Sequence, residues 1–191
     1  MEETLKQITH TNPNCLKVVL FGPESTGKST LAEALSKHFN TVFVEEFSRS
    51  YAEQKKEDGE VLTKADVLPI AVGQMQLENE RLKKANKILI CDTDLLETLV
   101  YSKMYYNGFC PEPVKKYAEE NTYDLYFLTY IDMPWEADGI RDQPHDRLQQ
   151  FKTFEAALNH FKKPYVVVKG AFEERLSFCI NQINELLNDT H

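Results

Sequence analysis

Long apolar stretches are missing from this sequence, and so is an excess of positive charge. No window of about 18 apolar residues occurs, so we expect no membrane-spanning helix. The N-terminal segment is polar and lacks the apolar centre of a signal peptide. The formal net charge of -8 disfavours non-specific binding to nucleic acid or anionic membranes, which needs a dense basic surface. We therefore expect a cytoplasmic protein with neither partner.

Cysteine is also scarce. The four cysteines are scattered along the chain without a CxxC pair, which argues against a zinc site or a disulfide framework and favours reduced thiols. A length of 191 residues suits one domain with a substantial core. We expect a flexible tail over residues 1–14 and a single domain over 15–191. Nothing in the sequence indicates a particular oligomeric state.

Short apolar runs alternate with segments of helical periodicity. The runs cover residues 18–21, 42–44, 88–91, 125–131 and 165–168, and most are continuously apolar, as in strands buried on both faces of a parallel sheet. Apolar residues recur at helical spacing in residues 63–85 and 171–188. This order predicts an α/β three-layer sandwich, with a five-stranded parallel sheet between layers of helices.

The segment GPESTGKS fits the phosphate-binding pattern GxxxxGK[ST] and lies between an apolar run and a helical pattern. Its glycines let the backbone wrap around an anion, and the loop amides point at phosphates. Lys28 supplies positive charge for the β- and γ-phosphates of ATP, and the Ser29 hydroxyl can bind Mg²⁺. The predicted nucleotide-binding residues are Gly22, Glu24, Ser25, Thr26, Gly27, Lys28, Ser29 and Thr30. The pattern predicts a P-loop NTPase fold without specifying a reaction.

Acidic residues follow two further apolar runs. Asp92 ends the run ILICD, where an acid of a P-loop protein helps to hold Mg²⁺, and Asp94 could face a substrate. The alternative is that Asp92 and Thr93 cap the following helix, and both roles can hold together. Glu46 follows the second run and could accept a proton from a substrate hydroxyl, or it could simply begin a solvated helix. Arg49 could bind phosphate or pair with Glu46.

Residues 133–147 form a polar insertion with two prolines and one glycine, followed by a helix that we expect to start near Asp146. Its Arg141 and Arg147 could close over the site as a lid, neutralise the transferring phosphoryl group and exclude water. Trp135 is the sole tryptophan and could stack on a flat ring or anchor the lid. The alternative for the loop is an exposed charged segment, and the alternative for Trp135 is packing in the core.

Signals of other P-loop classes are weak. The sequence has no NKxD-type guanine reader and no DxxG switch directly after a strand. A motor or AAA-type ATPase would normally be longer and would need a helical domain. A small-molecule kinase fits better, and the alternatives are an ATPase or nucleotide-binding regulator that acts through protein partners, or a kinase for another nucleoside.

Four segments together resemble the ribosylnicotinamide kinase domain of NadR-type proteins. They are GPESTGKSTL, EEFSRSY, ILICDTD and PWEADGIRDQPHDRLQQF, and the resemblance runs from about Lys17 to about Val168. The N-terminal tail is too short for a fused adenylyltransferase or DNA-binding domain, so we expect the kinase module alone.

The resemblance implies ATP- and Mg²⁺-dependent phosphorylation of the 5′-hydroxyl of nicotinamide riboside, which gives nicotinamide mononucleotide for NAD synthesis. Lys28, Glu46, Asp92, Arg141 and Arg147 would be catalytic. Either Glu46 or Asp92 could deprotonate the hydroxyl, and Ser29 and Asp92 would hold the metal. The predicted substrate-binding residues are Glu46, Arg49, Asp94, Trp135 and Asp138. Trp135 could stack on the cationic pyridinium ring.

Overall fold

Five parallel strands form one sheet in the computed structural model, which describes residues 2–9, 15–134 and 146–189. The strands are β1 (Leu16–Phe21), β2 (Phe43–Val44), β3 (Ile88–Asp92), β4 (Leu125–Thr129) and β5 (Tyr165–Val168), in the spatial order β2-β3-β1-β4-β5. In the central strand, Val18 lies opposite Ile90 of β3 and Leu125 of β4. The predicted parallel sheet and P-loop fold are confirmed.

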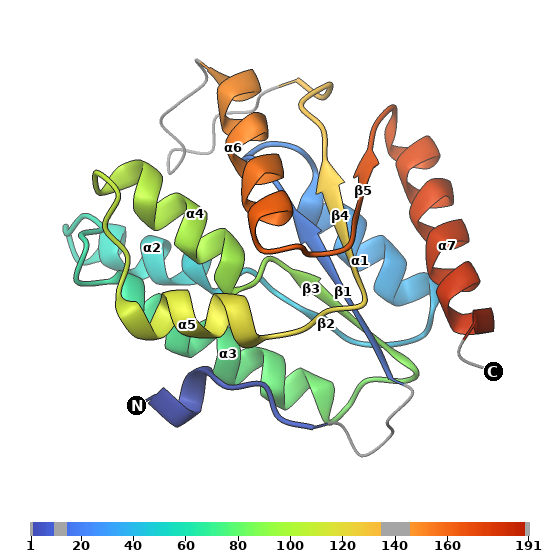
Figure 1. The fold of residues 1–191 in the computed structure, drawn as a ribbon, viewed down its shortest axis with the longest axis horizontal. Helices are drawn as coiled ribbons and strands as arrows, with labels where there is room; N and C mark the ends of the chain where they lie inside the picture. The colour runs from blue at the N-terminus through green and yellow to red at the C-terminus, as the bar shows by residue number, and fades with distance from the viewer. Residues whose placement is uncertain (1, 10–14, 135–145, 190–191) are drawn as a thin grey trace.

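Helices cover both faces of this sheet (Figure 1). They are α1 (Lys28–His38), α2 (Phe47–Glu57), α3 (Val67–Leu82), α4 (Leu95–Tyr105), α5 (Glu112–Glu120), α6 (Arg147–His160) and α7 (Phe172–Asp189). Helices α1 and α7 pack on one face, and α3, α4, α5 and α6 lie on the other. The helical spacing that predicted helices within residues 63–85 and 171–188 corresponds to α3 and α7.

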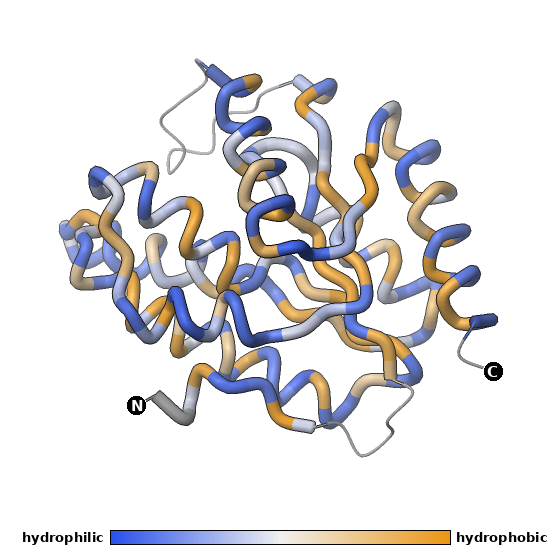
Figure 2. Tube along the Cα trace, in the orientation of Figure 1, coloured by the Kyte–Doolittle hydropathy of each residue, from blue (hydrophilic) through white to orange (hydrophobic). Residues whose placement is uncertain are grey.

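The hydrophobic core consists of two clusters separated by the sheet. Side chains alternate along β1, so Val18 and Leu20 pack toward α1 and α7, whereas Val19 and Phe21 pack toward the opposite helices. Both sets are fully buried. Figure 2 shows the central strands as apolar and the outer helices as alternately apolar and polar. This double burial explains why the strand segments are continuously apolar in sequence.

The described part of the N-terminal segment is not a loose tail, which corrects our expectation for residues 1–14. Glu2–Leu5 forms a 3-10 helix, η1, and the Leu5 side chain is fully buried in the core. The Gln7 amide donates to Glu78 Oε1 at 2.9 Å. The physical reason is that one buried leucine and a buried carboxylate partner fix a segment that looks polar in sequence.

The structure also bears on the cysteines and on membrane-spanning helices. All four cysteine side chains are buried and free. Among the described residues, no helix combines the length and apolar character needed to span a membrane.

Candidate active site

The loop between β1 and α1 has a tight backbone path. Gly22, Ser25 and Gly27 have φ angles of 136°, 54° and 79°. A Cβ on Gly22 would lie 2.8 Å from the Thr129 hydroxyl oxygen, so this position requires glycine. The hydroxyls of Thr26 and Thr129 lie 2.7 Å apart. The phosphate-binding loop is therefore held against the carboxyl end of β4.

Lys28 lies beneath this loop and is almost completely buried. Its ammonium group donates to the carbonyl oxygens of Gly22 at 2.7 Å and Pro23 at 3.0 Å. It also lies 3.2 Å from a carboxylate oxygen of Glu97, which is equally buried. Burial lowers the pKa of Lys28, but nearby carboxylates, Glu97 first, outweigh burial and raise it. Lys28 therefore stays cationic at neutral pH.

Asp92 lies at the carboxyl end of β3, as predicted, and is close enough to Glu46 for the two charges to interact. Burial and the charge of Glu46 raise the pKa of Asp92 to about 6, against the opposing effects of Lys28, a hydrogen bond with Ser29, and Arg49. The structure thus brings these five residues, from three separate sequence segments, to one edge of the sheet. Parallel strands place their carboxyl ends together, which makes this edge the usual ligand-binding edge of such folds.

One atom of Asp92 fits the predicted magnesium site. Its Oδ1 is buried and accepts no hydrogen bond from any residue that the structure describes. A buried carboxylate oxygen without a partner is costly unless a cation or water binds it. Hard oxygen ligands suit Mg²⁺, and Ser29 supplies a hydroxyl beside Asp92. The two predicted metal residues are therefore compatible with Mg²⁺.

A cavity of about 590 Å³ extends from Lys28 between α2, α3 and α4. Glu46 and Arg49 line it near the start of α2. On α4, the rings of Tyr101 and Tyr105 stack at 18° with centroids 5.9 Å apart, and both residues line the cavity. The cavity has room for a nucleoside and offers aromatic surface on one wall.

Three further residues predicted to bind the nucleotide are Glu24, which contacts the cavity wall, and Ser29 and Thr30, which are exposed. The Tyr105 hydroxyl donates to Glu24 Oε1 at 3.1 Å, which links the loop to the wall of the cavity. Ser29 and Thr30 are exposed in the first turn of α1, where hydroxyls can reach a ligand. The helix begins at Lys28, with Gly27 as its N-cap. A helix N-terminus next to the loop adds positive potential for phosphate binding.

Asp94 is not among the residues that line the cavity, and its predicted contact with a substrate stays a prediction. One of its carboxylate oxygens accepts the Glu97 backbone N–H at 3.0 Å and caps α4. The other accepts the Tyr126 hydroxyl at 2.7 Å inside the core. Both oxygens therefore accept hydrogen bonds that help to fix the start of α4.

The predicted lid lies mostly outside the described residues. Trp135, Asp138 and Arg141 fall in that part, so their predicted roles stay predictions. Arg147 is described as the first residue of α6, which confirms the expected helix start. Its guanidinium donates to the carbonyl oxygen of Met133 at 2.7 Å and to that of Ser25 at 3.2 Å. Arg147 thus contacts the phosphate-binding loop from the side of α6.

Sequence reasoning missed two buried charged residues. Glu97 follows Asp94 at the spacing of a capping box, yet its side chain accepts the Gly22 N–H at 3.3 Å and pairs with Lys28. Arg175 falls on the apolar face of α7, between Phe172 and Cys179, and only 1% of it is exposed. A charge at a core-facing position of an amphipathic helix is the signal that would have identified it.

The fold and the site define a protein with the P-loop NTPase fold, and solved structures with a similar fold include nucleoside and nucleotide kinases. The chain belongs to the family described as "AAA domain", whose model matches residues 17–175. The chain belongs to this family although its length of 191 residues is short for an AAA-type ATPase. The reason is that the loop and parallel sheet are common to kinases and ATPases.

The chain is 32% identical over 180 residues to the trifunctional NAD biosynthesis/regulator protein NadR of Salmonella typhimurium. This match covers 90% of the chain but only 43% of the relative. The chain is also similar to a crystal structure of NadR in complex with NR, with a TM-score of 0.78, 24% identity, and 92% and 52% of the two chains covered. It resembles deoxyadenosine kinase from M. mycoides with bound dCTP, with a TM-score of 0.60, 20% identity, and 89% and 100% covered. The predicted homology to NadR is confirmed.

Proposed function

We propose that the protein transfers the γ-phosphoryl group of ATP to the 5′-hydroxyl of nicotinamide riboside. The observation that carries this proposal is the cavity that ends at Lys28, with Glu46 on its wall and the Asp92 carboxylate beside them. Donor and acceptor can therefore meet at one point. The likeness to NadR, a relative named for NAD biosynthesis and solved with NR, supports this choice of acceptor.

On the donor side, the loop amides and Lys28 hold the β- and γ-phosphates, and Arg147 and Arg141 neutralise charge on the transferring group. Asp92 and Ser29 would hold Mg²⁺, which supplies charge neutralisation at the phosphate oxygens. The buried ammonium of Lys28 acts strongly because little water screens it.

On the acceptor side, a carboxylate orients the 5′-hydroxyl and accepts its proton. The hydroxyl oxygen forms a bond to the γ-phosphorus while the bond from that phosphorus to the bridging oxygen of ADP breaks. Glu46 lines the cavity and suits this role. Asp92, with a pKa of about 6, is the second candidate.

Recognition of the acceptor combines the aromatic and polar sides of the cavity. The ribose hydroxyls can reach Glu46 and Arg49, which line it. Trp135 would stack on the cationic pyridinium ring, a contact worth about 0.5–2 kcal/mol. We expect Trp135→Ala to raise the KM for nicotinamide riboside and to leave the KM for ATP little changed, which steady-state kinetics would show.

Two other functions have support. The fold is shared with deoxyadenosine kinase, so a different nucleoside could be the acceptor. The relatives are also named as regulators, which keeps open an ATPase that acts through protein partners. A partner-dependent ATPase rate without a small-molecule product would favour that alternative.

The test is a coupled ADP-release assay across a panel of nucleosides, with product identified by mass spectrometry. We expect nicotinamide riboside to give the largest kcat/KM. Glu46→Gln should lower kcat by at least tenfold, in the range of general-base effects of about 10²–10⁴. The matched control is Glu45→Gln, because Glu45 pairs with Arg81 on the surface and is not among the residues lining the cavity. No stimulation by any nucleoside, with folded protein that binds ATP, would reject the proposal.

A further inference from the structure

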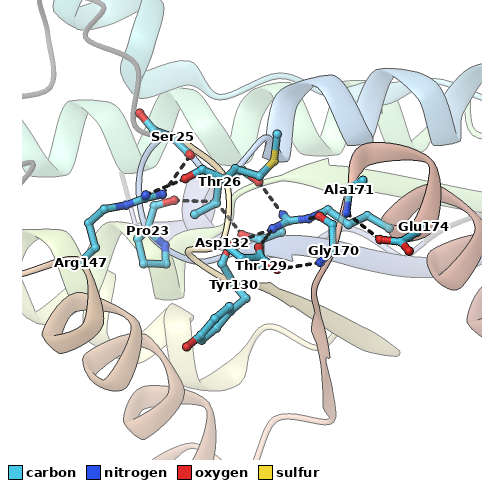
Figure 3. Close-up of polar contacts among 12 residues, drawn as sticks. Pro23, Ser25, Thr26, Thr129, Tyr130, Asp132, Arg147, Gly170, Ala171 and Glu174 are labelled. Carbon is cyan, nitrogen blue, oxygen red and sulfur yellow. Dashed lines mark hydrogen bonds and ion pairs between the residues drawn. The ribbon is translucent and has the colours of Figure 1, made fainter.

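The Arg175 side chain runs from α7 to the phosphate-binding loop, which lies far from Arg175 in the sequence but next to it in the structure. Figure 3 shows the contacts that converge here from the loop, the end of β4 and the turn before α7. Arg175 Nη1 donates to the Thr26 carbonyl oxygen at 2.8 Å, and Nε donates to the Gly170 carbonyl oxygen at 2.8 Å. Nη2 donates to the Tyr130 carbonyl oxygen at 3.0 Å and pairs with Asp132.

This arrangement uses features of arginine that lysine lacks. The guanidinium has its donors in a fixed plane, and here they reach three carbonyl oxygens and one carboxylate. Asp132 is itself held, because its other oxygen accepts the Gly170 N–H at 2.7 Å. The charge of Arg175 is thus paired and its direction is fixed, as a buried charge requires.

The contact with Thr26 has a consequence for the next amide. In a planar trans peptide, the carbonyl and the N–H point in opposite directions. When Arg175 holds the Thr26 carbonyl, the Gly27 N–H of the same peptide is turned away from the guanidinium. Arg147 acts in the same way on the neighbouring peptide, since it donates to the Ser25 carbonyl oxygen and thereby orients the Thr26 N–H.

We propose that Arg175 is a positioning residue for phosphate binding: it presets the Gly27 amide to face the phosphates of the donor nucleotide. The effect acts through the backbone, without contact between Arg175 and ATP. Preset donors need no reorganisation when charge arrives, which increases their contribution to binding. This inference rests on the nucleotide-binding part of the proposed function and is independent of which nucleoside is the acceptor.

A purely structural role is the competing explanation, because Arg175 also fastens α7 to the ends of β4 and β5. The two roles predict different ligand dependence. A preset amide concerns phosphate alone, so ATP and inorganic tripolyphosphate should be affected alike. A role limited to fastening α7 would lower the stability of the protein and leave the affinities for both ligands unchanged.

The experiment measures the Kd values of ATP and inorganic tripolyphosphate, each with Mg²⁺, by calorimetry at low temperature. The variants are Arg175→Lys, which keeps the charge, and Arg175→Ala. Arg175→Lys serves even if the alanine variant does not fold. Ile183→Ala is the matched control, because Ile183 is buried on the same helix and packs in the core beneath α1.

We expect Arg175→Lys to raise the Kd values of both ligands by a similar factor, roughly tenfold or more, as for a lost hydrogen bond to a charged group. Ile183→Ala should lower the melting temperature and leave both Kd values within about twofold of wild type, because its effect is on core packing. Three results would overturn the proposal. The first is weaker binding of ATP with an unchanged affinity for tripolyphosphate, and the second is a lower melting temperature with both affinities unchanged. The third is an equal loss of affinity in Ile183→Ala. Wild-type protein that binds both ligands but phosphorylates no nucleoside would reject the proposed kinase function alone.

Discussion

Lys28 Nζ and Glu97 Oε1 lie 3.2 Å apart in the interior, at the point where the phosphate-binding loop meets the cavity between α2, α3 and α4. The pair joins α1 to α4, and the second oxygen of Glu97 accepts the Gly22 N–H. Burial raises the pKa of Glu97 well above its ordinary value, and the charge of Lys28 opposes this shift. Glu97 therefore modulates the positive charge available to phosphate.

The first prediction concerns Glu97→Gln. An ionised Glu97 repels the phosphates and occupies Lys28, so its neutralisation should strengthen nucleotide binding. We expect the rise in melting temperature caused by saturating Mg²⁺-ATP at pH 8 to be larger in Glu97→Gln than in wild type, by a few degrees. Differential scanning fluorimetry measures both shifts. An equal or smaller shift would show that Glu97 does not compete with phosphate.

The second prediction separates the structural and chemical roles of Lys28. Lys28→Met leaves the buried Glu97 without its cation, so we expect a loss of roughly 3 kcal/mol in unfolding free energy and no measurable turnover. The double variant Lys28→Met/Glu97→Gln should recover most of the stability and none of the turnover. Urea unfolding and ADP release test the two parts. Recovered turnover in the double variant would contradict a role for Lys28 in phosphoryl transfer.

The third prediction concerns Gly73 on α3. Alanine normally stabilises a helix by about 1 kcal/mol relative to glycine. Here a Cβ would lie 2.1 Å from the ring of Phe47, at the start of α2 and next in sequence to Glu46, so the ring must move. We expect Gly73→Ala to raise the acceptor KM several-fold at an unchanged KM for ATP.

The same structural reasoning supplies the control. Phe47→Leu combined with Gly73→Ala removes the far atoms of the ring and should restore the acceptor KM at least in part. An unchanged acceptor KM in Gly73→Ala would mean that α2 and α3 do not position the acceptor.

The fourth prediction concerns stability and pH. Burial raises the pKa of Glu78 above its ordinary value of 4.5, in spite of hydrogen bonds from Tyr123 and Gln7. Stability from the protonated Glu78 is fully present below pH 4.5 and is lost as the pH rises through the raised pKa. Glu78→Gln stays neutral and keeps both partners, because the Tyr123 hydroxyl can also accept a hydrogen bond.

We therefore expect Glu78→Gln to melt a few degrees above wild type at pH 8, with a smaller difference at pH 4.5. Calorimetry across this range measures the effect. A difference that grows toward acid pH would contradict a raised pKa.

Much of the fold could be predicted from the sequence because its signals are local. The loop GPESTGKS has its glycines and lysine within eight residues, and the buried strands are continuous apolar runs. Asp92 and Glu46 could be placed near the loop because parallel strands end at a common edge. The cap that Asp94 forms on α4 could not be predicted, because a carboxylate two residues beyond a strand can face the site or cap the next helix, and sequence does not distinguish the two.

By itself, the sequence determined the parallel sheet, the phosphate-binding loop and the segments that meet there, because each depends on neighbouring residues or on a strand period. Only the tertiary structure decided which charges pair. Glu97 joins Lys28 across 69 positions of sequence, and Arg175 reaches Thr26 across 149. Such pairs depend on how α4 and α7 dock against the sheet. Burial makes an unpaired charge costly, so the fold places these partners together. No local sequence pattern indicates which residues will pair.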